Sequence, residues 1–261
     1  MQAGRSSIQF EHPPIITSAA SIVGQTEGEG PLASFFDRVE PDPTFGKKSW
    51  EEAESELQRQ TVQKCLDKAG RQAADVNCLF AGDLLGQIVA TSFGVESFDI
   101  PFFGLYGACS TMGEAMILGA MAAGAGYADR VLALASSHFA SAERQFRFPL
   151  AYGNQRPQST TWTVTGCGCV MIEKNEGKDG RRAKENALES LKNSGQKNLR
   201  HGFQPCIPAV TPGKIVDMQV RDSMNMGAAM AVAAADTILQ NFRDFNRKPS
   251  DYDRIITGDL G

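Results

Sequence analysis

The sequence predicts an α/β fold in which a sheet is covered by helices on both faces and the folding unit occurs twice. Three short runs are mainly apolar, VNCLFAG (76–82), PFFGLY (101–106) and RVLALAS (130–136), and helical segments separate them. Strands that are apolar on both faces belong to a sheet that is buried on both sides. The second observation is an internal repeat that joins a helix to such a strand.

Two helices are predicted between these strands. Ser49 and Glu52 have the S-x-x-E spacing of a capping box, in which each side chain bonds a backbone N–H group of the other residue. Apolar residues follow at helical spacing, and Gly70 is typical of a helix end. Residues 110–123 are rich in Ala, Met and Leu, which predicts a buried helix that ends at Gly124. The first 48 residues carry strand and turn signals.

The repeat lies in DVNCLFAGDL (75–84) and DYDRIITGDL (251–260), which both end in Gly-Asp-Leu at an offset of 176 residues (259 minus 83). At the same offset Trp50 aligns with Met226, so the helix before each strand is repeated as well. The alternative is two unrelated helix–strand pairs. We interpret the pattern as a duplicated α/β unit whose second copy has only begun.

The repeat and the composition divide the chain into three parts. Residues 1–176 are expected to form a complete first half, and residues 207–261 the start of a second half that is truncated. Between them, 177–206 is expected to be a basic insert or loop, since 178–201 contains seven Lys or Arg residues and three acidic ones. Such a segment either touches an acidic partner or a membrane surface, or is a solvated loop between strands.

Composition excludes several classes of function. The net charge is −4 over 261 residues, so no overall field attracts the chain to nucleic acid or anionic lipid. The six cysteines lack zinc-site spacing, and HExxH, P-loop and GxGxxG motifs are absent. No signal peptide is visible, and the apolar stretch 115–128 is too short to span a bilayer. We therefore expect a soluble protein without cofactor or metal, which reaches any membrane through partners.

Cys109, in YGACSTMGEA (106–115), is the first candidate for chemistry because it lies where a strand gives way to a helix. The positive end of a helix dipole and its free N–H groups lower the pKa of a thiol, and they also hold an oxyanion or a carboxylate. Small residues beside Cys109 leave room for a ligand. The alternative is an inert, buried cysteine.

Other candidates follow the predicted strands. A thiolate nucleophile needs a positioned base, and His138 follows the third strand, although it is equally suited to bond a loop carbonyl. Asp83, which comes after a glycine at a strand end, is either a ligand contact or the cap of the next helix. Arg144 and Arg147, interleaved with aromatic residues, either grip an anion or belong to an ion-paired structural loop.

Five segments carry a resemblance to a known family: FAGDLLGQ, FGLYGACSTMGEA, SSHFASAERQFRFPLAYGNQRP, TPGKIVDM and MGAAMAVAAADTI. In this order they resemble the stage V sporulation protein AD family of endospore-forming bacteria. That family resembles thiolases and condensing enzymes, which implies a thiolase-like fold with a duplicated βαβαβαββ unit, here with the second copy incomplete. The insert near 177–205 and Val232, where proline is expected, depart from the family's pattern.

The resemblance implies a binding protein rather than an enzyme. Its ligand would be dipicolinic acid, free or as the calcium chelate, and it would work in the uptake system that loads the forespore, with membrane proteins of the same sporulation operon. The family's cysteine falls on Cys109, its aspartate on Asp83 and its SSH pair on Ser137 and His138. With the arginines, the expected ligand-binding residues are Asp83, Cys109, Ser137, His138, Arg144 and Arg147.

The resemblance also implies a location and an alternative function. The chain is expected to form a homodimer in the cytoplasm or at the periphery of the inner spore membrane, with no nucleic acid partner. The alternative function is an acyl-transferring condensing enzyme with Cys109 as nucleophile. In condensing enzymes the second half supplies the catalytic histidines, so the scarcity of bases in this chain favours binding.

Overall fold

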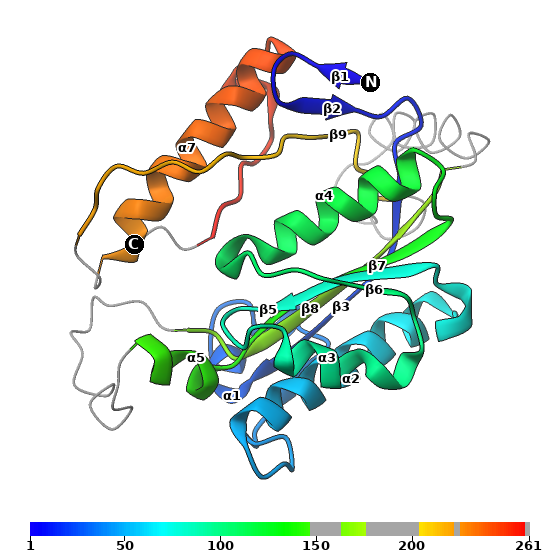
Figure 1. Cartoon of the computed structure of the whole chain (residues 1–261), viewed down its shortest axis with the longest axis vertical. Coiled ribbons are helices and arrows are strands. Elements are labelled where there is room, and N and C mark those ends of the chain that lie inside the picture. The colour runs from blue at the N-terminus through cyan, green and yellow to red at the C-terminus, as the bar shows by residue number, and fades with distance from the viewer. Residues whose placement is uncertain (147–162, 176–203, 222–224, 259–261) are drawn as a thin grey trace, which may run out of the picture.

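The computed structural model describes residues 1–146, 163–175, 204–221 and 225–258. Within these ranges the main element is a six-stranded sheet in the order β4-β3-β8-β7-β5-β6 (Figure 1). β5 pairs in parallel with β6 and β7, whereas β8 is antiparallel to both β3 and β7. The strands are β3 (Ile15–Gly24), β4 (Arg38–Glu40), β5 (Cys78–Asp83), β6 (Phe102–Gly104), β7 (Arg130–Ser137) and β8 (Gly166–Glu173).

Helices cover both faces of this sheet (Figure 1). α2 (Trp50–Ala69) and α3 (Val89–Val95) lie on one face, and α4 (Thr111–Gly124) lies on the other. The short helices α1 (Gln25–Gly28) and α5 (Phe139–Phe146) each follow the end of a strand. Short 3-10 turns complete the first unit: η1 (Ala33–Phe35), η2 (Ala73–Asp75), η3 (Glu96–Phe98) and η4 (Ala108–Ser110).

Alternate side chains of the central strand β7 pack against opposite helical layers. Leu132 and Leu134 belong to the buried cluster that includes α2, and Val131 and Ala133 belong to the cluster that includes α4. All four are 0 % exposed. Because side chains alternate along a strand, an apolar run fills both layers at once. The predicted α/β architecture is confirmed.

The predicted start and end of α2 are confirmed, and those of α4 agree to within one residue. The Ser49 side chain accepts a hydrogen bond from the Glu52 N–H (3.2 Å), and the Glu52 carboxylate accepts one from the Ser49 N–H (3.2 Å), which completes the capping box. Gly70 ends α2 with a left-handed φ of 63°. α4 begins one residue later than predicted, at Thr111, and ends at Gly124.

A smaller sheet joins the N-terminal strands β1 and β2 to the segment that follows residue 206. It has the order β1-β2-β9, with antiparallel pairing throughout, and β9 follows residue 206. Residues 8 and 9, in the predicted first half, therefore pair with residues 209 and 210 of the later segment. The elements are β1 (Gln2–Ala3), β2 (Ser7–Gln9), β9 (Ala209–Val210), the long helix α7 (Met226–Phe245) and the 3-10 turn η6 (Pro249–Asp251).

The predicted repeat is present in its helix and absent in its strand. α7 and α2 are both 20 residues long and begin at the two positions that the repeat aligns. By contrast, residues 252–258 form no strand, and Ile256 is 86 % exposed. A strand is stable only beside hydrogen-bonded neighbours, and no described strand pairs with this segment. The expectation of a second apolar strand there is wrong for the described residues.

Two further expectations concern the surface and the membrane. The basic stretch within the predicted insert 177–206 falls on residues 176–203, outside the described residues. Among the helices that are described, none has both the length and the apolar composition required to cross a bilayer.

Candidate functional site at the carboxyl edge of the sheet

Three neighbouring parallel strands bring most of the predicted site residues to one edge of the sheet. β5 ends at Asp83 and β7 ends at Ser137, with β6 alongside β5. Cys109 follows β6, and His138 follows β7. The carboxyl ends of parallel strands lie at the same edge, where open α/β sheets bind their ligands. We refer to this part of the molecule as the carboxyl edge.

Cys109 is exposed, in the 3-10 turn that leads into α4. Its interpretation as an inert buried sulfur is therefore wrong. The preceding residue, Ala108, has a φ of 47°, a left-handed conformation that is unfavourable for a residue with a Cβ. The Thr111 hydroxyl fixes the turn, because it donates to the Ala108 carbonyl (2.8 Å) and accepts from the Gly107 N–H (3.3 Å). The thiol thus sits on a strained, well-anchored turn.

A close backbone approach holds this turn against β5. A Cβ added to Gly82 would lie 2.1 Å from the carbonyl oxygen of Leu105, so no larger residue fits there without movement. The Leu105 N–H donates to the Ala81 carbonyl at 2.8 Å, which continues the β5–β6 pairing beyond the strand. Glycine at position 82 therefore sets how near the Cys109 loop comes to the end of β5.

Asp83 caps the helix that follows it. Its Oδ2 accepts hydrogen bonds from the N–H (3.2 Å) and the hydroxyl (2.8 Å) of Thr91, and its Oδ1 accepts from the Ile88 N–H (3.3 Å). The side chain is 0 % exposed. Of the two interpretations that the sequence leaves open, the capping role is the one with contacts in the structure. The residue still lies directly under the carboxyl edge.

Both ring nitrogens of His138 have backbone partners. Nε2 lies 2.7 Å from the Pro43 carbonyl, which only accepts, so Nε2 carries the proton, and Nδ1 accepts from the Ala140 N–H (3.2 Å). Burial lowers the pKa of His138, which favours this neutral form. The imidazole thus bonds a loop carbonyl, which is one of the two roles that the sequence left open for His138. The neighbouring Ser137 hydroxyl donates to the Val164 carbonyl at 2.5 Å.

The arginine segment is described only in part. Arg144, on α5, forms an ion pair with Glu51 at the start of α2. Arg147, the second predicted anion contact, lies outside the described residues. Next to Arg144, the buried Glu143 accepts hydrogen bonds from the N–H (3.1 Å) and the hydroxyl (2.9 Å) of Thr163. The described part of this segment therefore has the contacts of an ion-paired structural loop.

A buried polar cluster beneath the carboxyl edge was not predicted from the sequence. Glu54 of α2 is 2 % exposed, and its carboxylate accepts from the hydroxyls of Ser136 (2.7 Å) and Ser141 (2.8 Å). Gln58, one turn further along α2, donates to the hydroxyls of Thr91 and Ser136. Burial and, to a smaller degree, the nearby Asp83 raise the pKa of Glu54. Two polar residues at i and i+4 on an otherwise apolar helix face were the available signal.

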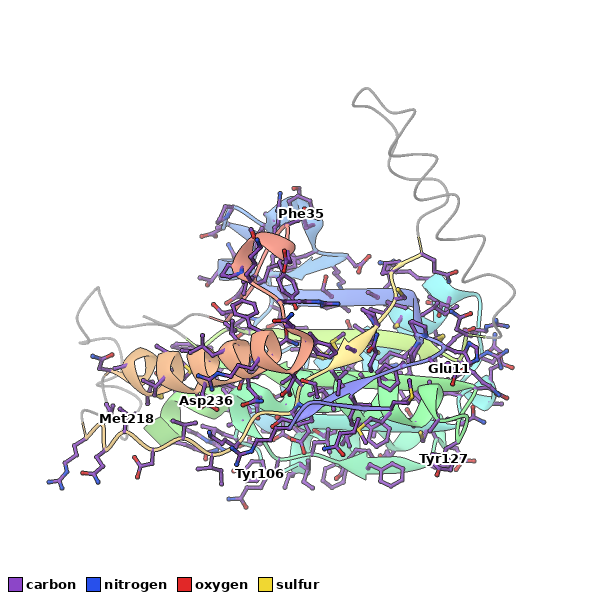
Figure 2. All side chains as sticks on the ribbon, turned by 90° about the horizontal axis from the view of Figure 1, so that it is seen from above. Glu11, Phe35, Tyr106, Tyr127, Met218 and Asp236 are labelled. Carbon is purple, nitrogen blue, oxygen red and sulfur yellow. The ribbon has the colours of Figure 1, made fainter. Side chains whose placement is uncertain are left out.

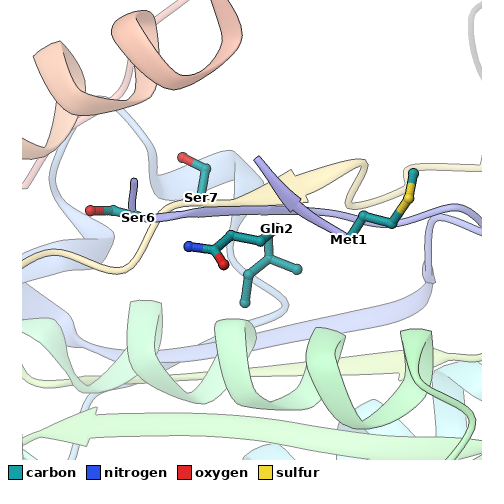
Figure 3. A pocket seen from close by; sticks show the side chains of 5 residues that line it. Met1, Gln2, Ser6 and Ser7 are labelled. Carbon is teal, nitrogen blue, oxygen red and sulfur yellow. The ribbon is translucent and has the colours of Figure 1, made fainter. Parts of the chain in front are cut away.

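Two of the described cavities are large, and one of them is lined by Glu51, the ion-pair partner of Arg144. A groove of about 710 Å³ runs between the start of α2 and α3, lined by residues such as Lys48, Arg59 and Phe93. A second pocket, of about 420 Å³, is lined by Met1, Gln2, Ser6, Ser7 and Ile8 beside the β1–β2 hairpin (Figure 3). Neither is lined by a predicted ligand-binding residue. No group of three potential metal ligands occurs in the described part of the chain.

The fold defines a class of protein. The structure is similar to 3-oxoacyl-(acyl carrier protein) synthase III of Xanthomonas oryzae pv. oryzae, with a TM-score of 0.53, 13 % identity, and coverage of 95 % of this chain and 77 % of the other. It is equally similar to the H285N variant of OleA from Xanthomonas campestris, with a TM-score of 0.53, 12 % identity and the same coverage. The chain therefore has the thiolase-like fold of condensing enzymes.

Sequence comparison identifies the family within that class. The family model for stage V sporulation protein AD (SpoVAD) matches residues 4–261. A curated relative, stage V sporulation protein AD of Bacillus subtilis (strain 168), is 40 % identical over 257 residues, which span 98 % of this chain and 68 % of the relative. The chain belongs to the stage V sporulation protein AD family, as the sequence motifs predicted.

Proposed function

We propose that the chain is the dipicolinic acid-binding component of a sporulation-specific uptake system that loads the forespore. Membership of a sporulation protein family supports the biological setting. The ligand is an aromatic dianion, free or as its calcium chelate, and membrane proteins of the same operon would be the partners. The expected location is the cytoplasm or the periphery of the inner spore membrane.

One observation favours binding over acyl transfer. Cys109 is exposed at the carboxyl edge, whereas His138, which the sequence allowed either as its base or as a partner of a loop carbonyl, is buried and has backbone partners at both ring nitrogens. A thiol without a base to take up its proton is a poor nucleophile for acyl chemistry. It remains a suitable wall for a bound ligand. In this proposal the backbone N–H groups at the start of α4 receive one carboxylate of dipicolinate.

The second carboxylate needs a cationic partner. Arg144 is the described candidate, and it would exchange its ion pair with Glu51 for the ligand. Glu51 and Arg144 are both partly exposed, so their ion pair contributes little stability. A carboxylate of the ligand that excludes water from Arg144 would form a stronger contact with it. The proposal also keeps Asp83, Ser137, His138 and Arg147 as residues that line or support the site.

The sheet edge next to Cys109 supports the expected homodimer. Among the described strands β6 pairs with β5 alone, so its outer backbone groups are unpaired. Phe103 on this strand is 54 % exposed, and Tyr106 just beyond it is 53 % exposed. Figure 2 shows where Tyr106 lies on the ribbon. An apolar edge strand is a template for pairing with a second chain. We propose that two copies of β6 pair across this edge.

Calorimetry with dipicolinate tests the ligand. We expect saturable heat with the unmodified chain, loss of that heat in Cys109→Phe, and no change in the control Cys206→Phe, which alters an exposed cysteine elsewhere. Intact mass after incubation with acyl-CoA tests the alternative. A mass gain on Cys109 without any heat from dipicolinate would show that the chain is an acyltransferase and that our proposal is wrong.

A further inference from the structure

A chain of hydrogen bonds connects two buried carboxylates beneath the carboxyl edge. On one side, the Thr91 hydroxyl donates to Asp83 at 2.8 Å. On the other, the Ser136 hydroxyl donates to Glu54 at 2.7 Å. Asp83 comes from β5 and Glu54 from α2, and both are at most 2 % exposed. Both carboxylates are therefore buried, and each accepts a hydrogen bond from a hydroxyl group.

Gln58 closes the connection. Its Nε2 lies 3.0 Å from the Thr91 hydroxyl and 2.6 Å from the Ser136 hydroxyl. Each hydroxyl already donates its single hydrogen to a carboxylate, so each accepts one hydrogen from the amide. The amide oxygen of Gln58 is left without a partner among the described residues. A buried oxygen without a hydrogen bond lowers the free energy of unfolding. The orientation of the amide is therefore dictated by the two hydroxyls, and theirs by Asp83 and Glu54.

The charge along this chain of hydrogen bonds is unbalanced. Neither Asp83 nor Glu54 takes part in an ion pair within the described residues, so two negative charges would share one buried network. The titratable groups nearest Glu54 are Asp83 on β5 and the thiol of Cys167 on β8, whose pKa burial raises. α3 contributes the N–H and hydroxyl of Thr91, and β7 and α5 contribute serine hydroxyls. The buried Glu143 on α5 accepts hydrogen bonds from Thr163. Two like charges in a low-dielectric site are costly, and one proton relieves the cost.

We propose that Glu54 is the proton-holding group of this network, beside the buried carboxylate of Asp83, and that an anion bound at the carboxyl edge enters together with a proton on Glu54. This proposal rests on the proposed function, because it concerns how that site accepts a dianion. The step is a protonation alone: a buffer acid gives up one proton, the Glu54 carboxylate receives it, and no other bond changes. The bound anion adds negative potential near Asp83, which makes a second ionised carboxylate less favourable.

Carboxyl carbon NMR of the ligand-free chain tests the protonation of Glu54 itself. We expect one glutamate carboxyl to titrate at higher pH than the exposed glutamates, to be absent in Glu54→Gln, and to shift toward ordinary behaviour in Asp83→Asn. Gln58→Leu, which removes the connecting amide, is the second variant in case the loss of the Asp83 cap prevents folding. Glu56→Gln is the matched control, because Glu56 lies on the same helix but pairs with Arg59 at the surface. A Glu54 signal that titrates with the exposed glutamates would overturn the proposal.

Calorimetry in two buffers of different ionisation enthalpy tests the link to the ligand. Dipicolinate is the probe, and its binding heat should differ between the buffers in the unmodified chain and in Glu56→Gln, but not in Glu54→Gln. Where a whole proton is taken up, affinity should weaken about tenfold per unit rise in pH. Equal heats in both buffers would contradict the proton-linked step while leaving the proposed function intact. No heat at all would contradict the proposed function and the proton-linked step together.

Discussion

The carboxylate of Asp244, in the last turn of α7, accepts two hydrogen bonds from Ser7, one from its backbone N–H (2.9 Å) and one from its hydroxyl (2.8 Å). The backbone N–H groups of Arg5 (2.8 Å) and Ser6 (2.9 Å) donate to the same carboxylate. Three successive N–H groups form a concave nest for an anion. This nest joins the N-terminal hairpin to α7, at the opposite end of the described chain.

We expect Asp244→Asn to release the hairpin from α7. Hydrogen bonds from Arg5, Ser6 and Ser7 lower the pKa of Asp244, so the folded state prefers the ionised form. A depressed pKa contributes stability that is fully present above the unfolded value of about 4 and is lost as the pH falls below it. The protection factors of the amides of residues 5–7, which correct for the slower intrinsic exchange in acid, should be high at neutral pH, lower in acid, and low at both in Asp244→Asn.

Asp236→Asn is the control for this prediction. Asp236 lies on the same helix and pairs with Lys214, and although it lines a small pocket with Arg5 and Ser6, the N–H groups of residues 5–7 donate to Asp244 and not to Asp236. Its replacement should leave exchange at residues 5–7 unchanged. Slow exchange in Asp244→Asn would show that the hairpin is held by its strand pairing with β9 instead.

Replacement of Gly82 by alanine should be strongly destabilising. The new Cβ would collide with the Leu105 carbonyl, a backbone group that cannot turn away, and overpacking of this kind costs about 3 kcal/mol. Gly168→Ala on β8 is the matched control, because no atom lies within 4 Å of its added Cβ, and its effect should stay within about 0.5 kcal/mol. Urea unfolding of both variants checks the difference. Equal stabilities would mean that the Cys109 loop moves freely away from β5.

The buried imidazole of His138 should make the free energy of unfolding depend on pH. Burial lowers its pKa in the folded state, so the unfolded state binds more protons at mildly acidic pH. The contribution of His138 is therefore complete above the ordinary value of 6.5 and falls as the pH drops below it, by at most about 1.4 kcal/mol per pH unit. His138→Gln, which keeps a donor toward Pro43, should lack this slope. The exposed His12→Gln should retain it, and identical profiles for all three chains would refute the assignment.

Alkylation should divide the six cysteines into three groups. Cys109 and Cys206 are exposed and should react first with iodoacetamide. Cys78 should follow slowly, because it is half-buried and burial raises the pKa of its thiol. The three buried thiols should react only after unfolding: Cys65, Cys167 and Cys169. Peptide mapping by mass spectrometry measures the order, and early labelling of Cys169 would contradict the buried position of β8.

The sequence predicted those features that depend on neighbours along the chain. The Ser49–Glu52 capping box and the end of α4 at Gly124 follow from residues a few positions apart, so local pattern was sufficient. The apolar run of β7 specified burial on both faces for the same reason. The strand expected at 251–260 failed because its apolar pattern cannot supply the neighbouring strands that it needs.

The site was less predictable because its contacts join distant residues. Gln58 meets Thr91 and Ser136 only after three elements have packed, so the spacing of Glu54 and Gln58 on α2 could indicate a buried polar pair but not its partners. Asp83 had two interpretations that local sequence could not separate, since capping depends on how the chain turns before Thr91. The position of Cys109 was predictable, but its exposure was not.

The place of β8 in the sheet has a consequence for synthesis on the ribosome. β8 is the last strand of the six to be translated, yet it lies between β3 and β7 and pairs with both. Until residue 173 has left the exit tunnel, β3 and β4 cannot join β5, β6 and β7, and the nascent chain carries two separate strand groups with unpaired edges. Closure of so distant a pairing is slow. Such edges invite association between nascent chains, so a chaperone that shields them during translation should raise the yield of folded protein.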